Sequence, residues 1–287
     1  MTNENVLVLG LGEIGRTLFE LLKEEKGFNA YGLDLDEEKM HAAGQERSKL
    51  PNEVDTMHVC LPCKAQDTFV DVVAAYAEQF KPKLLIINST VPPGTTKEVR
   101  KKCRCLVAHS PTRGVHKSLE HMKWEMKRWT KYVGGSNQKA AEATQKHFEK
   151  MHLKVKTLKS CAETELAKLF ETTYRAWMIA SFQEMHRIAR KFETDFDGVV
   201  DFLEDTHRIR FDRPIMFPGF IGGHCLIPNT EILLESYDSK FLKLILESNE
   251  KRRTEIKDKT VLLEAEKIAK RVSALEKELG EKSGECD

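Results

Sequence analysis

The chain has 287 residues, which is enough for two domains, and its 40% hydrophobic and 32% charged residues are typical of a globular protein. The charges nearly cancel, with 46 Lys and Arg against 45 Asp and Glu, so no net field gathers nucleic acid. No apolar run reaches the ~20 residues that a membrane-spanning helix needs. The seven cysteines follow no disulfide spacing, and the N-terminus is typical of a strand rather than a signal peptide. We therefore expect a reduced, cytoplasmic protein that binds neither nucleic acid nor membranes.

Short β-rich runs alternate with helical segments through the first half of the chain. The predicted strands are residues 6–9, 31–35, 56–61, 84–88, 105–109 and 132–134, and a helical segment follows the first of them at 10–23. Strands that alternate with helices pair in parallel and carry helices on both faces of their sheet. The order therefore predicts an α/β domain with a doubly wound parallel sheet, which we place at residues 1–157.

The pattern changes from alternating to helical near Thr157. Residues 163–192 contain no Gly or Pro and carry apolar residues at helical spacing, which predicts one long amphipathic helix. Residues 213–229 gather three prolines and three glycines, which is typical of a loop, and helix is predicted again from Glu231 to the end. We therefore expect an all-α domain over residues 158–259, built on the long helix, and a helical tail over residues 260–287.

A stripe of apolar residues runs along the predicted tail helix. Its members are spaced alternately four and three residues apart: Val261, Ala265, Ile268, Val272, Leu275 and Leu279. A heptad stripe of this length fits an oligomer contact and a helix packed on its own domain equally well.

A glycine-rich GxGxxG string, with Gly10, Gly12 and Gly15, directly follows the first strand and opens the first helix. Gly10 permits the tight turn, Gly12 lets the backbone approach a pyrophosphate, and Gly15 lets the helix pack close to the strand. The start of the helix, at Glu13 and Ile14, supplies unpaired N–H groups to the diphosphate. In this context the string predicts a Rossmann-type dinucleotide site.

Asp34 lies at the end of the second predicted strand, 19 residues beyond Gly15. A carboxylate at this place accepts hydrogen bonds from the adenosine ribose and repels a 2′-phosphate, so NAD is favoured over NADP. The alternative is that Asp34 caps the next helix, but Asp36 fits that capping role better. We therefore predict that NAD is the cofactor.

Three further segments are informative through their order in the chain. They are Asn88-Ser-Thr90-Val-Pro-Pro-Gly-Thr-Thr96, Glu163-Thr-Glu-Leu-Ala-Lys168-Leu and Pro218-Gly-Phe-Ile-Gly-Gly-His-Cys225. Together with the glycine-rich string, they resemble the UDP-glucose and GDP-mannose dehydrogenase family. The resemblance runs from the first strand to about Lys259, and its most specific parts are the STVPPGT and GGHC strings.

The resemblance implies an oxidoreductase that converts the sugar alcohol of a nucleotide sugar to a carboxylate in two NAD-dependent steps. It implies that Cys225 forms a thiohemiacetal with the substrate aldehyde and that Lys168 stabilises the developing oxyanion. Thr90 matches a family hydroxyl beside the nicotinamide and the catalytic water.

Further matches concern the cofactor and the assembly. Lys39 matches a family position near the adenosine phosphate or ribose, and Leu61 and Pro62 lie at a strand end where the family has a nucleotide-contacting turn. The family forms dimers through its central helical domain, so the resemblance implies a homodimer through the long helix.

The residue types fit this chemistry without reference to the family. A thiolate adds readily to an aldehyde, and a Lys ammonium stabilises negative oxygen in a water-poor site. Two alternatives stay open. Cys225 could be a small buried hydrophobic residue, and Lys168 could be a solvated charge that pairs with Glu165, three residues before it.

The chain departs from the family pattern near the predicted chemistry. The family's aspartate four residues after the cysteine is Asn229, and an amide cannot accept the proton from the water that hydrolyses a thioester. The family's asparagine four residues after the lysine is Thr172, and the glutamate of its Pro-Glu pair is Thr112. We expect no third α/β domain after the central domain, so a nucleotide-sugar substrate would need a partner chain to replace it.

Two other functions stay open at this point. One is a two-electron hydroxy-acid dehydrogenase that uses Lys168 without the cysteine. The other is a catalytically inactive NAD-binding scaffold. No metal site is expected, because Cys60 and Cys63 have no second CxxC pair or paired histidines beside them.

Overall fold

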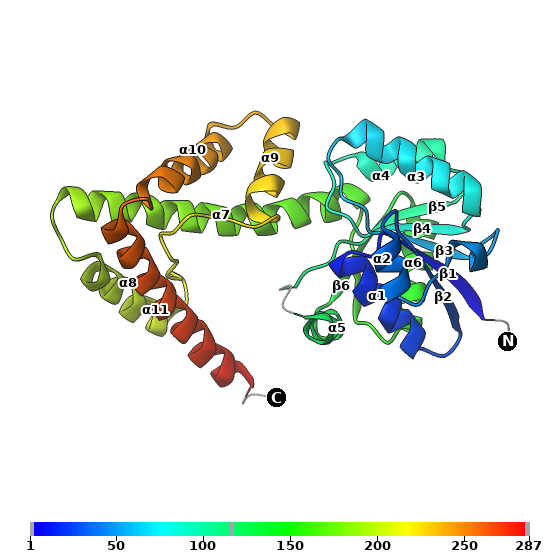
Figure 1. Ribbon diagram of the computed structural model, residues 1–287, viewed down its shortest axis with the longest axis horizontal. Coiled ribbons are helices and arrows are strands. Elements are labelled where there is room, and N and C mark those ends of the chain that lie inside the picture. The colour runs from blue at the N-terminus through cyan, green and yellow to red at the C-terminus, as the bar shows by residue number, and fades with distance from the viewer. Residues whose placement is uncertain (1–2, 115–117, 285–287) are drawn as a thin grey trace. The chain divides into compact units, whose positions relative to one another are not determined.

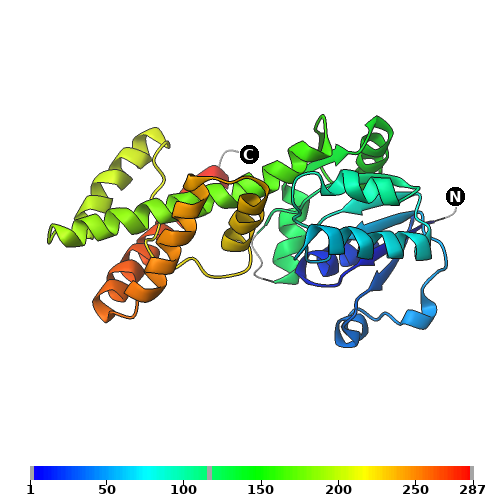
Figure 2. The same ribbon diagram turned by 90° about the horizontal axis from the view of Figure 1, so that it is seen from above.

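The computed structural model describes residues 3–114 and 118–284, without the side chains of residues 279–284 (Figures 1 and 2). The chain divides into two compact units, Met1–Lys168 and Leu169–Asp287, each described by itself below. The first unit holds a sheet with alternating helices and the second is helical, which confirms the predicted fold class. The division falls inside the long helix, and the predicted domain limits of 1–157, 158–259 and 260–287 stay predictions.

Seven strands form the sheet in the described part of the first unit, in the spatial order β2-β1-β3-β4-β5-β6-β7. They are β1 (Glu4–Leu9), β2 (Phe28–Leu33), β3 (Thr56–Val59), β4 (Leu84–Ile87), β5 (Leu106–His109), β6 (Lys131–Gly135) and β7 (Val155–Thr157). The last four residues of β1 and all four of β4 are apolar and buried, as expected of strands covered on both faces.

Helices cover both faces of this sheet. They are α1 (Glu13–Glu24), α2 (Glu37–Ala42), α3 (Gln66–Phe80), α4 (Thr95–Lys102), α5 (Leu119–Arg128) and α6 (Gln138–Lys150), with a 3₁₀ turn at Arg47–Lys49. Helices α3 and α4 lie on one face, and α1, α5 and α6 lie on the other (Figures 1 and 2). The buried face of α1 carries Leu18, Phe19 and Leu22, which are fully buried in the core of the unit.

The first five strands pair in parallel with their ends in register. Leu9 lies opposite both Leu33 and Val59. Val59 in turn lies opposite Ile87, and Ile87 lies opposite His109. The residues that follow these strands therefore emerge along one edge of the sheet, which we call the carboxyl edge.

Strand β6 differs from the predicted parallel arrangement, because it runs antiparallel to β5, with His109 opposite Gly134. An antiparallel strand starts at the edge where its predecessor ends, so the connection through α5 begins and ends at the carboxyl edge. Strand β7 was not predicted, since its three residues include an exposed Lys156 and Thr157 and show no apolar run. It pairs in parallel with β6.

The predicted long helix is confirmed as α7 (Cys161–Lys191), and three more helices follow α8 (Phe196–Arg210) in the described part of the second unit. These are α9 (Leu226–Ser236), α10 (Lys240–Glu255) and α11 (Lys259–Gly284). Helix α9 begins inside the predicted loop 213–229. Pro228 is tolerated there because it is the third helical residue, where a backbone N–H has no partner within the helix.

The buried face of α7 is partly polar. Leu169 and Ala180 of its apolar stripe are buried. Phe170, Ile188 and Phe192 are 55%, 50% and 69% exposed, whereas Gln183 and His186 are fully buried. Polar contacts therefore determine much of the packing of this helix.

Two buried side-chain amides, Gln183 on α7 and Asn249 on α10, bind the segment that leads to Cys225. Gln183 Nε2 donates to the Gly219 carbonyl at 2.7 Å. Asn249 on α10 accepts from the Ile221 N–H at 2.7 Å and donates to the Ile221 carbonyl at 3.1 Å. Because buried backbone groups must be paired, these side chains take the place of a regular secondary structure at residues 219–221.

The apolar stripe of the tail packs within its own unit. Its members on α11 are buried from Val261 to Leu275, and the Leu279 side chain lies outside the described residues. Ion pairs join α11 to α8, including Lys267 with Asp197 at 2.9 Å. The structure therefore favours packing on the chain's own helices.

We expect Asn249→Ala to lower the free energy of unfolding by about 3 kcal/mol, because it leaves both backbone groups of a buried Ile221 unpaired. Glu250→Ala is the matched control, since Glu250 is exposed on the same helix. Urea unfolding measures both. Equal effects of the two substitutions would contradict the role of Asn249.

Candidate active site

The predicted site residues of the first unit gather along the carboxyl edge. Gly10 follows β1, Asp34 follows β2, Leu61 and Pro62 follow β3, and Thr90 follows β4. Ligands of open parallel sheets bind outside the carboxyl ends of the strands. The edge is therefore the place to look for a cofactor and a substrate.

The three glycines of the GxGxxG string meet different constraints. A Cβ on Gly15 would lie 1.7 Å from the Gly10 carbonyl oxygen, so the start of α1 packs directly on the turn. Gly10 has a φ of +90°, and its Cβ would lie 2.7 Å from the Cys60 carbonyl oxygen. Gly12 is exposed, and its Cβ would meet nothing within 4 Å. The space at Gly12 is open to a ligand, whereas the other two glycines serve the fold.

Asp34 is half-buried and organises the turn beside it. Its Oδ2 accepts a hydrogen bond from the Leu11 N–H at 2.6 Å, and its Oδ1 accepts one from the Asp36 N–H at 3.0 Å. Asp36, as predicted, caps α2 by accepting from the Glu38 N–H. Asp34 is thus not the cap of α2, and its predicted bond to a ribose stays a prediction.

A cavity of about 520 Å³ lies beside this turn. Its lining includes three predicted residues, Gly12, Glu13 and Lys39, as well as Arg16 of α1. Arg16 pairs through Nη2 with Glu20 at 2.8 Å, while its buried Nε has no hydrogen-bond partner among the described residues. The sequence analysis missed Arg16, although its place directly after the third glycine was a usable signal. A buried N–H donor beside an open turn suits an anionic ligand.

The other predicted cofactor residues lie around the same turn. Ile14 is half-buried at the start of α1. Leu61 is half-buried and lies against Gly10, and Pro62 is exposed.

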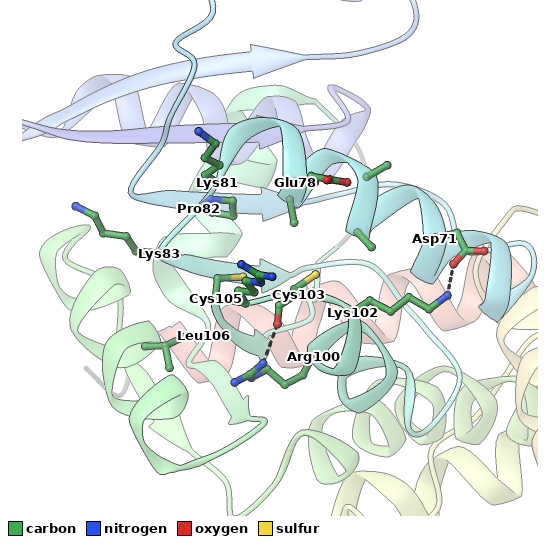
Figure 3. A pocket seen from close by; sticks show the side chains of 14 residues that line it. Asp71, Glu78, Lys81, Pro82, Lys83, Arg100, Lys102, Cys103, Cys105 and Leu106 are labelled. Atoms are coloured by element: carbon green, nitrogen blue, oxygen red, sulfur yellow. Dashed lines mark hydrogen bonds and ion pairs between the residues drawn. The ribbon is translucent and has the colours of Figure 1, made fainter.

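The larger cavity of the first unit, about 1050 Å³, lies at the opposite edge of the sheet (Figure 3). It is lined by the ends of α3 and α4 and by residues 103–106, and none of the predicted site residues lies in it. Its cationic side chains largely have partners: Lys102 pairs with Asp71, and Arg100 donates to the Cys103 carbonyl (Figure 3). Size alone therefore does not locate the site.

A buried carboxylate ties the segment that begins at Asn88 to the helix that carries Lys168. Glu165 is fully buried, and its two oxygens accept from the Gly94 N–H at 2.7 Å and from the Thr96 N–H and hydroxyl at 2.8 and 2.6 Å. Burial raises the pKa of Glu165, and the hydrogen bonds from Thr96 and Gly94 oppose that rise. The interpretation of Glu165 as one half of a surface pair with Lys168 is wrong, because this carboxylate caps α4 instead.

Lys168 is half-buried on α7, three residues after Glu165. Glu165 thereby holds the helical turn of Lys168 against the segment that carries Thr90. His109 adds a second tie, since its ring contacts Thr164 Oγ1 at 2.8 Å and the Ser89 carbonyl at 3.1 Å. Burial lowers the pKa of His109 to about 3, so the ring is neutral.

A series of hydrogen-bonded, largely buried polar side chains extends from Asn88 into the sheet. Asn88 donates to the Ser110 carbonyl at 2.8 Å and contacts His58 at 2.9 Å. His58 in turn contacts His147, and His147 contacts Glu4 at 3.0 Å. Burial raises the pKa of Glu4, but hydrogen bonds from His147, Thr56 and Lys150 outweigh it and lower the pKa to about 2. The sequence signal for this chain was a histidine inside a buried apolar strand.

The predicted residues of the second unit also cluster. Cys225 is half-buried and is the N-cap residue of α9, and its carbonyl accepts from the Asn229 N–H at 3.0 Å. The buried Asn229 amide donates to the Thr172 hydroxyl at 3.1 Å. The two positions of this unit that depart from the family pattern are thus in direct contact. Thr90 and Lys168 belong to the first unit and these three residues to the second.

Two other features were searched among the described residues. No three His, Cys, Asp or Glu side chains among them come close enough to hold a metal ion. No helix in the described ranges has the length and apolarity that crossing a membrane requires.

We expect Gly15→Ala and Gly12→Ala to separate folding from cofactor binding. The first forces a methyl group to 1.7 Å from a carbonyl oxygen and should lower the melting temperature by several degrees, with loss of NAD binding. The second meets open space at a φ of −67° and should leave the melting temperature unchanged while weakening NAD binding at least about tenfold. Calorimetry and NAD titration measure both, and full NAD affinity in Gly12→Ala would contradict the assigned turn.

Comparison with known proteins adds a family to this geometry. Residues 162–251 match the sequence model of the UDP-glucose/GDP-mannose dehydrogenase family, central domain. The chain is 26% identical over 308 residues to a UDP-N-acetyl-D-mannosamine dehydrogenase of Methanocaldococcus jannaschii, covering 93% of this chain and 68% of that protein. It is 23% identical to a UDP-glucose 6-dehydrogenase of Campylobacter jejuni, covering 86% and 72%. The chain thus spans about two thirds of the length of these relatives.

Solved structures show the same fold. The UDP-D-ManNAc dehydrogenase of Pyrococcus horikoshii superposes with a TM-score of 0.73 at 21% identity, over 86% of this chain and 68% of that one. The 3-hydroxyisobutyrate dehydrogenase of Mycobacterium tuberculosis superposes with a TM-score of 0.66 at 15% identity, over 90% of this chain and 95% of that one. Residues 162–251 thus match the central domain of the UDP-glucose/GDP-mannose dehydrogenase family, and the chain as a whole is similar to about two thirds of the length of longer nucleotide-sugar dehydrogenases.

Proposed function

We propose that the chain catalyses the NAD-dependent oxidation of the sugar alcohol of a nucleotide sugar, with Cys225 as the nucleophile and Lys168 as the oxyanion-stabilising cation. The observation that carries the proposal is the set of hydrogen bonds from Gly94 and Thr96 to the buried Glu165. A buried carboxylate is costly, and here it joins the two family segments that carry Thr90 and Lys168. We expect a protein to bear the free-energy cost of this burial where the two segments must act together.

The carboxyl edge of the first unit fits NAD. The open space at Gly12, the N–H groups of Glu13 and Ile14 and the unpaired Arg16 Nε suit a diphosphate. Asp34 suits the ribose hydroxyls, and Lys39 lines the same cavity. NAD supplies the hydride acceptor when it is bound there.

The chemistry of the substrate falls to three side chains. The Lys168 ammonium stabilises negative charge on the oxygen of the reacting carbon, and the Thr90 hydroxyl positions that oxygen or a water molecule. Cys225 stands at the start of α9, where unpaired backbone N–H groups stabilise a thiolate. Its sulfur forms a bond to the aldehyde carbon, and the oxygen takes a proton. The resulting thiohemiacetal becomes a thioester when its carbon gives a second hydride to NAD and its hydroxyl loses a proton.

Release of the acid by hydrolysis of the thioester is the step for which this chain has no base at the position of the family aspartate. Water must lose a proton to attack the thioester, and the Asn229 amide has no basic atom to receive it. Its Nδ2 is already committed to Thr172. We therefore propose that thioester hydrolysis is the slow step.

A second candidate function is a two-electron hydroxy-acid dehydrogenase that uses Lys168 alone. Asn229 favours it, because a reaction that forms no thioester needs no base at that position. An inactive NAD-binding protein is the remaining alternative.

The assembly stays at the level of a proposal. Phe170 and Tyr174 on α7 are 55% and 62% exposed, which supports a homodimer through this helix. A partner chain that supplies a nucleotide-binding domain and a cytoplasmic location stay predictions from the family resemblance.

We expect two NADH per molecule of limiting nucleotide sugar, and at most one in Cys225→Ala, because the second oxidation needs the sulfur–carbon bond. NADH absorbance across a panel of UDP-sugars, GDP-sugars and small hydroxy acids measures this. Cys105→Ala is the control, since Cys105 lies at the opposite edge of the sheet. Two NADH from Cys225→Ala would overturn the covalent role. One NADH from a hydroxy acid in both proteins would favour the second candidate, and NAD binding without turnover would favour an inactive protein.

We expect Asn229→Asp to accelerate the release of the acid by about 10²-fold, because a carboxylate can accept the proton of water. The Thr172 hydroxyl now accepts from Asn229 and donates to the Leu169 carbonyl, and it can turn from that carbonyl to donate to the new carboxylate. Single-turnover kinetics of the second NADH and of acid release measure the gain. Asn229→Ala is the control, and an equal rate in both variants would show that hydrolysis uses another base.

A further inference from the structure

Lys131 is a buried cation that none of the steps above uses. It is the first residue of β6, is 6% exposed, and its Nζ lies 5.4 Å from the centre of the Phe148 ring. The ammonium donates to the Ser110 carbonyl at 3.1 Å, to the Pro111 carbonyl at 3.2 Å and to the Thr112 hydroxyl at 2.9 Å. Three donors thus meet three acceptors on three successive residues.

These acceptors form the turn that follows β5 at the carboxyl edge. The Ser110 carbonyl also accepts from Asn88 Nδ2 at 2.8 Å, and Asn88 is two residues before Thr90. The Ser110 carbonyl therefore accepts hydrogen bonds from both Lys131 and Asn88, and Asn88 belongs to the segment that carries Thr90. A shift of the turn at residues 110–112 would lengthen or bend the hydrogen bond from Asn88 to the Ser110 carbonyl.

Of the described groups that act electrostatically on Lys131, only a Cys60 thiolate would be negative. His58 faces it from β3 and Cys60 from directly after that strand. The other neighbours are His109 of β5, Arg113 of the connection that follows, Phe148 of α6 and Lys168 of α7. No carboxylate contacts its Nζ in the parts of the chain that the structure describes. Position 112, where the family pattern has a glutamate, carries a threonine hydroxyl instead.

We propose that Lys131 is the positioning residue of the turn at residues 110–112, and that the turn is held beside Asn88 only while the Lys131 amine keeps its third proton. A neutral amine has two N–H donors and one lone pair, and its hydrogen bonds lose the positive charge that makes them about twice as strong. Even if the Thr112 hydroxyl reverses and donates to the lone pair, the turn is held less tightly. The positioning follows from the contacts themselves. Its effect on substrate binding rests on the function proposed above.

The protonation of Lys131 changes near neutral pH. Burial lowers the pKa of Lys131 to about 7; a Cys60 thiolate would oppose this, and Lys168 and Arg113 add to the lowering. Burial also raises the pKa of Cys60 to about 12, so this thiol is neutral at physiological pH and does not restore the balance. The turn is therefore held below about pH 7 and loosened above it.

Global stability moves in the opposite direction over the same range. The ordinary pKa of 10.5 falls to about 7 on folding, so between these values the unfolded chain binds more protons than the folded one. The contribution of Lys131 to the free energy of unfolding therefore rises with pH from about 7 towards 10.5. A local loosening that accompanies a rise in global stability separates a positioning role from a merely structural one.

Hydrogen exchange of a peptide that covers residues 108–114 tests the proposal, with rates corrected for the intrinsic effect of pH. In the wild-type protein we expect protection to fall about fivefold between pH 6 and pH 8.5, as the hydrogen bonds of Lys131 lose their positive charge. Lys131→Arg keeps its charge at every pH and should show no such transition. Thr112→Glu gives the amine a carboxylate partner and should move the transition up by about one pH unit or more. Thr112→Ser keeps the hydroxyl and should leave it in place.

The same transition in Lys131→Arg, or a wild-type protection that does not depend on pH, would overturn the proposal. If Lys131→Arg does not fold, Thr112→Glu against Thr112→Ser decides alone. Kinetics then addresses the link to function: the KM for the sugar substrate should rise across the transition, while the dissociation constant of NAD stays constant. Because hydrogen exchange needs no turnover, a transition in a protein without dehydrogenase activity would refute the proposed function and leave the role of Lys131 standing.

Discussion

The site depends on one buried interaction, the acceptance of three hydrogen bonds by Glu165 from the start of α4. The N–H groups at the start of a helix need acceptors, and an ionised carboxylate at that end also meets the positive end of the helix dipole. Glu165 supplies the acceptor from another helix, α7, so it satisfies a local need of α4 and fixes a distant element at once. Lys168 sits where it does because α4 needs a cap.

In the second unit, buried side-chain amides likewise satisfy backbone groups and fix the site residues. The chain before Cys225 has no regular structure at residues 219–221, and the amides of Gln183 and Asn249 satisfy its backbone groups. The contact between Asn229 and Thr172 then fixes α9 to α7 within this unit. Since both of these residues depart from the family pattern and touch each other, the two departures form one change of chemistry rather than two independent ones.

Much of the fold was predictable, because period and spacing report directly on it. The six predicted strands were all found, and so were the long helix and the capping role of Asp36. The reversal of β6 was not predictable, because a strand carries the same alternation in either direction. The polar residues on the buried face of α7 were not predictable from its apolar pattern, since Gln183 and His186 are buried there through polar partners across the unit.

The candidate site was predictable where a motif marks it and not where a tertiary contact makes it. The glycine string and the segment with Thr90 could be found from spacing. Glu165 resembled an ordinary surface charge, and Lys131 carried no signal at all, because its partners are three residues that lie 19 to 21 positions earlier in the chain. Burial of a charge can be read only after the sheet has been assembled.

The reversed direction of β6 determines what kind of residue the carboxyl edge can recruit. Every parallel strand presents the residue that follows its last pair, so loops alone would furnish this edge. An antiparallel strand enters from the same edge and brings its own first residue there. In β6 this residue is paired with Val155 of β7 rather than carried on a loop. Side chains on strands are held more rigidly than side chains on loops. The reversed strand β6 therefore places one residue, at position 131, at the carboxyl edge on a strand instead of a loop. Any side chain at this position is held by the backbone of the sheet.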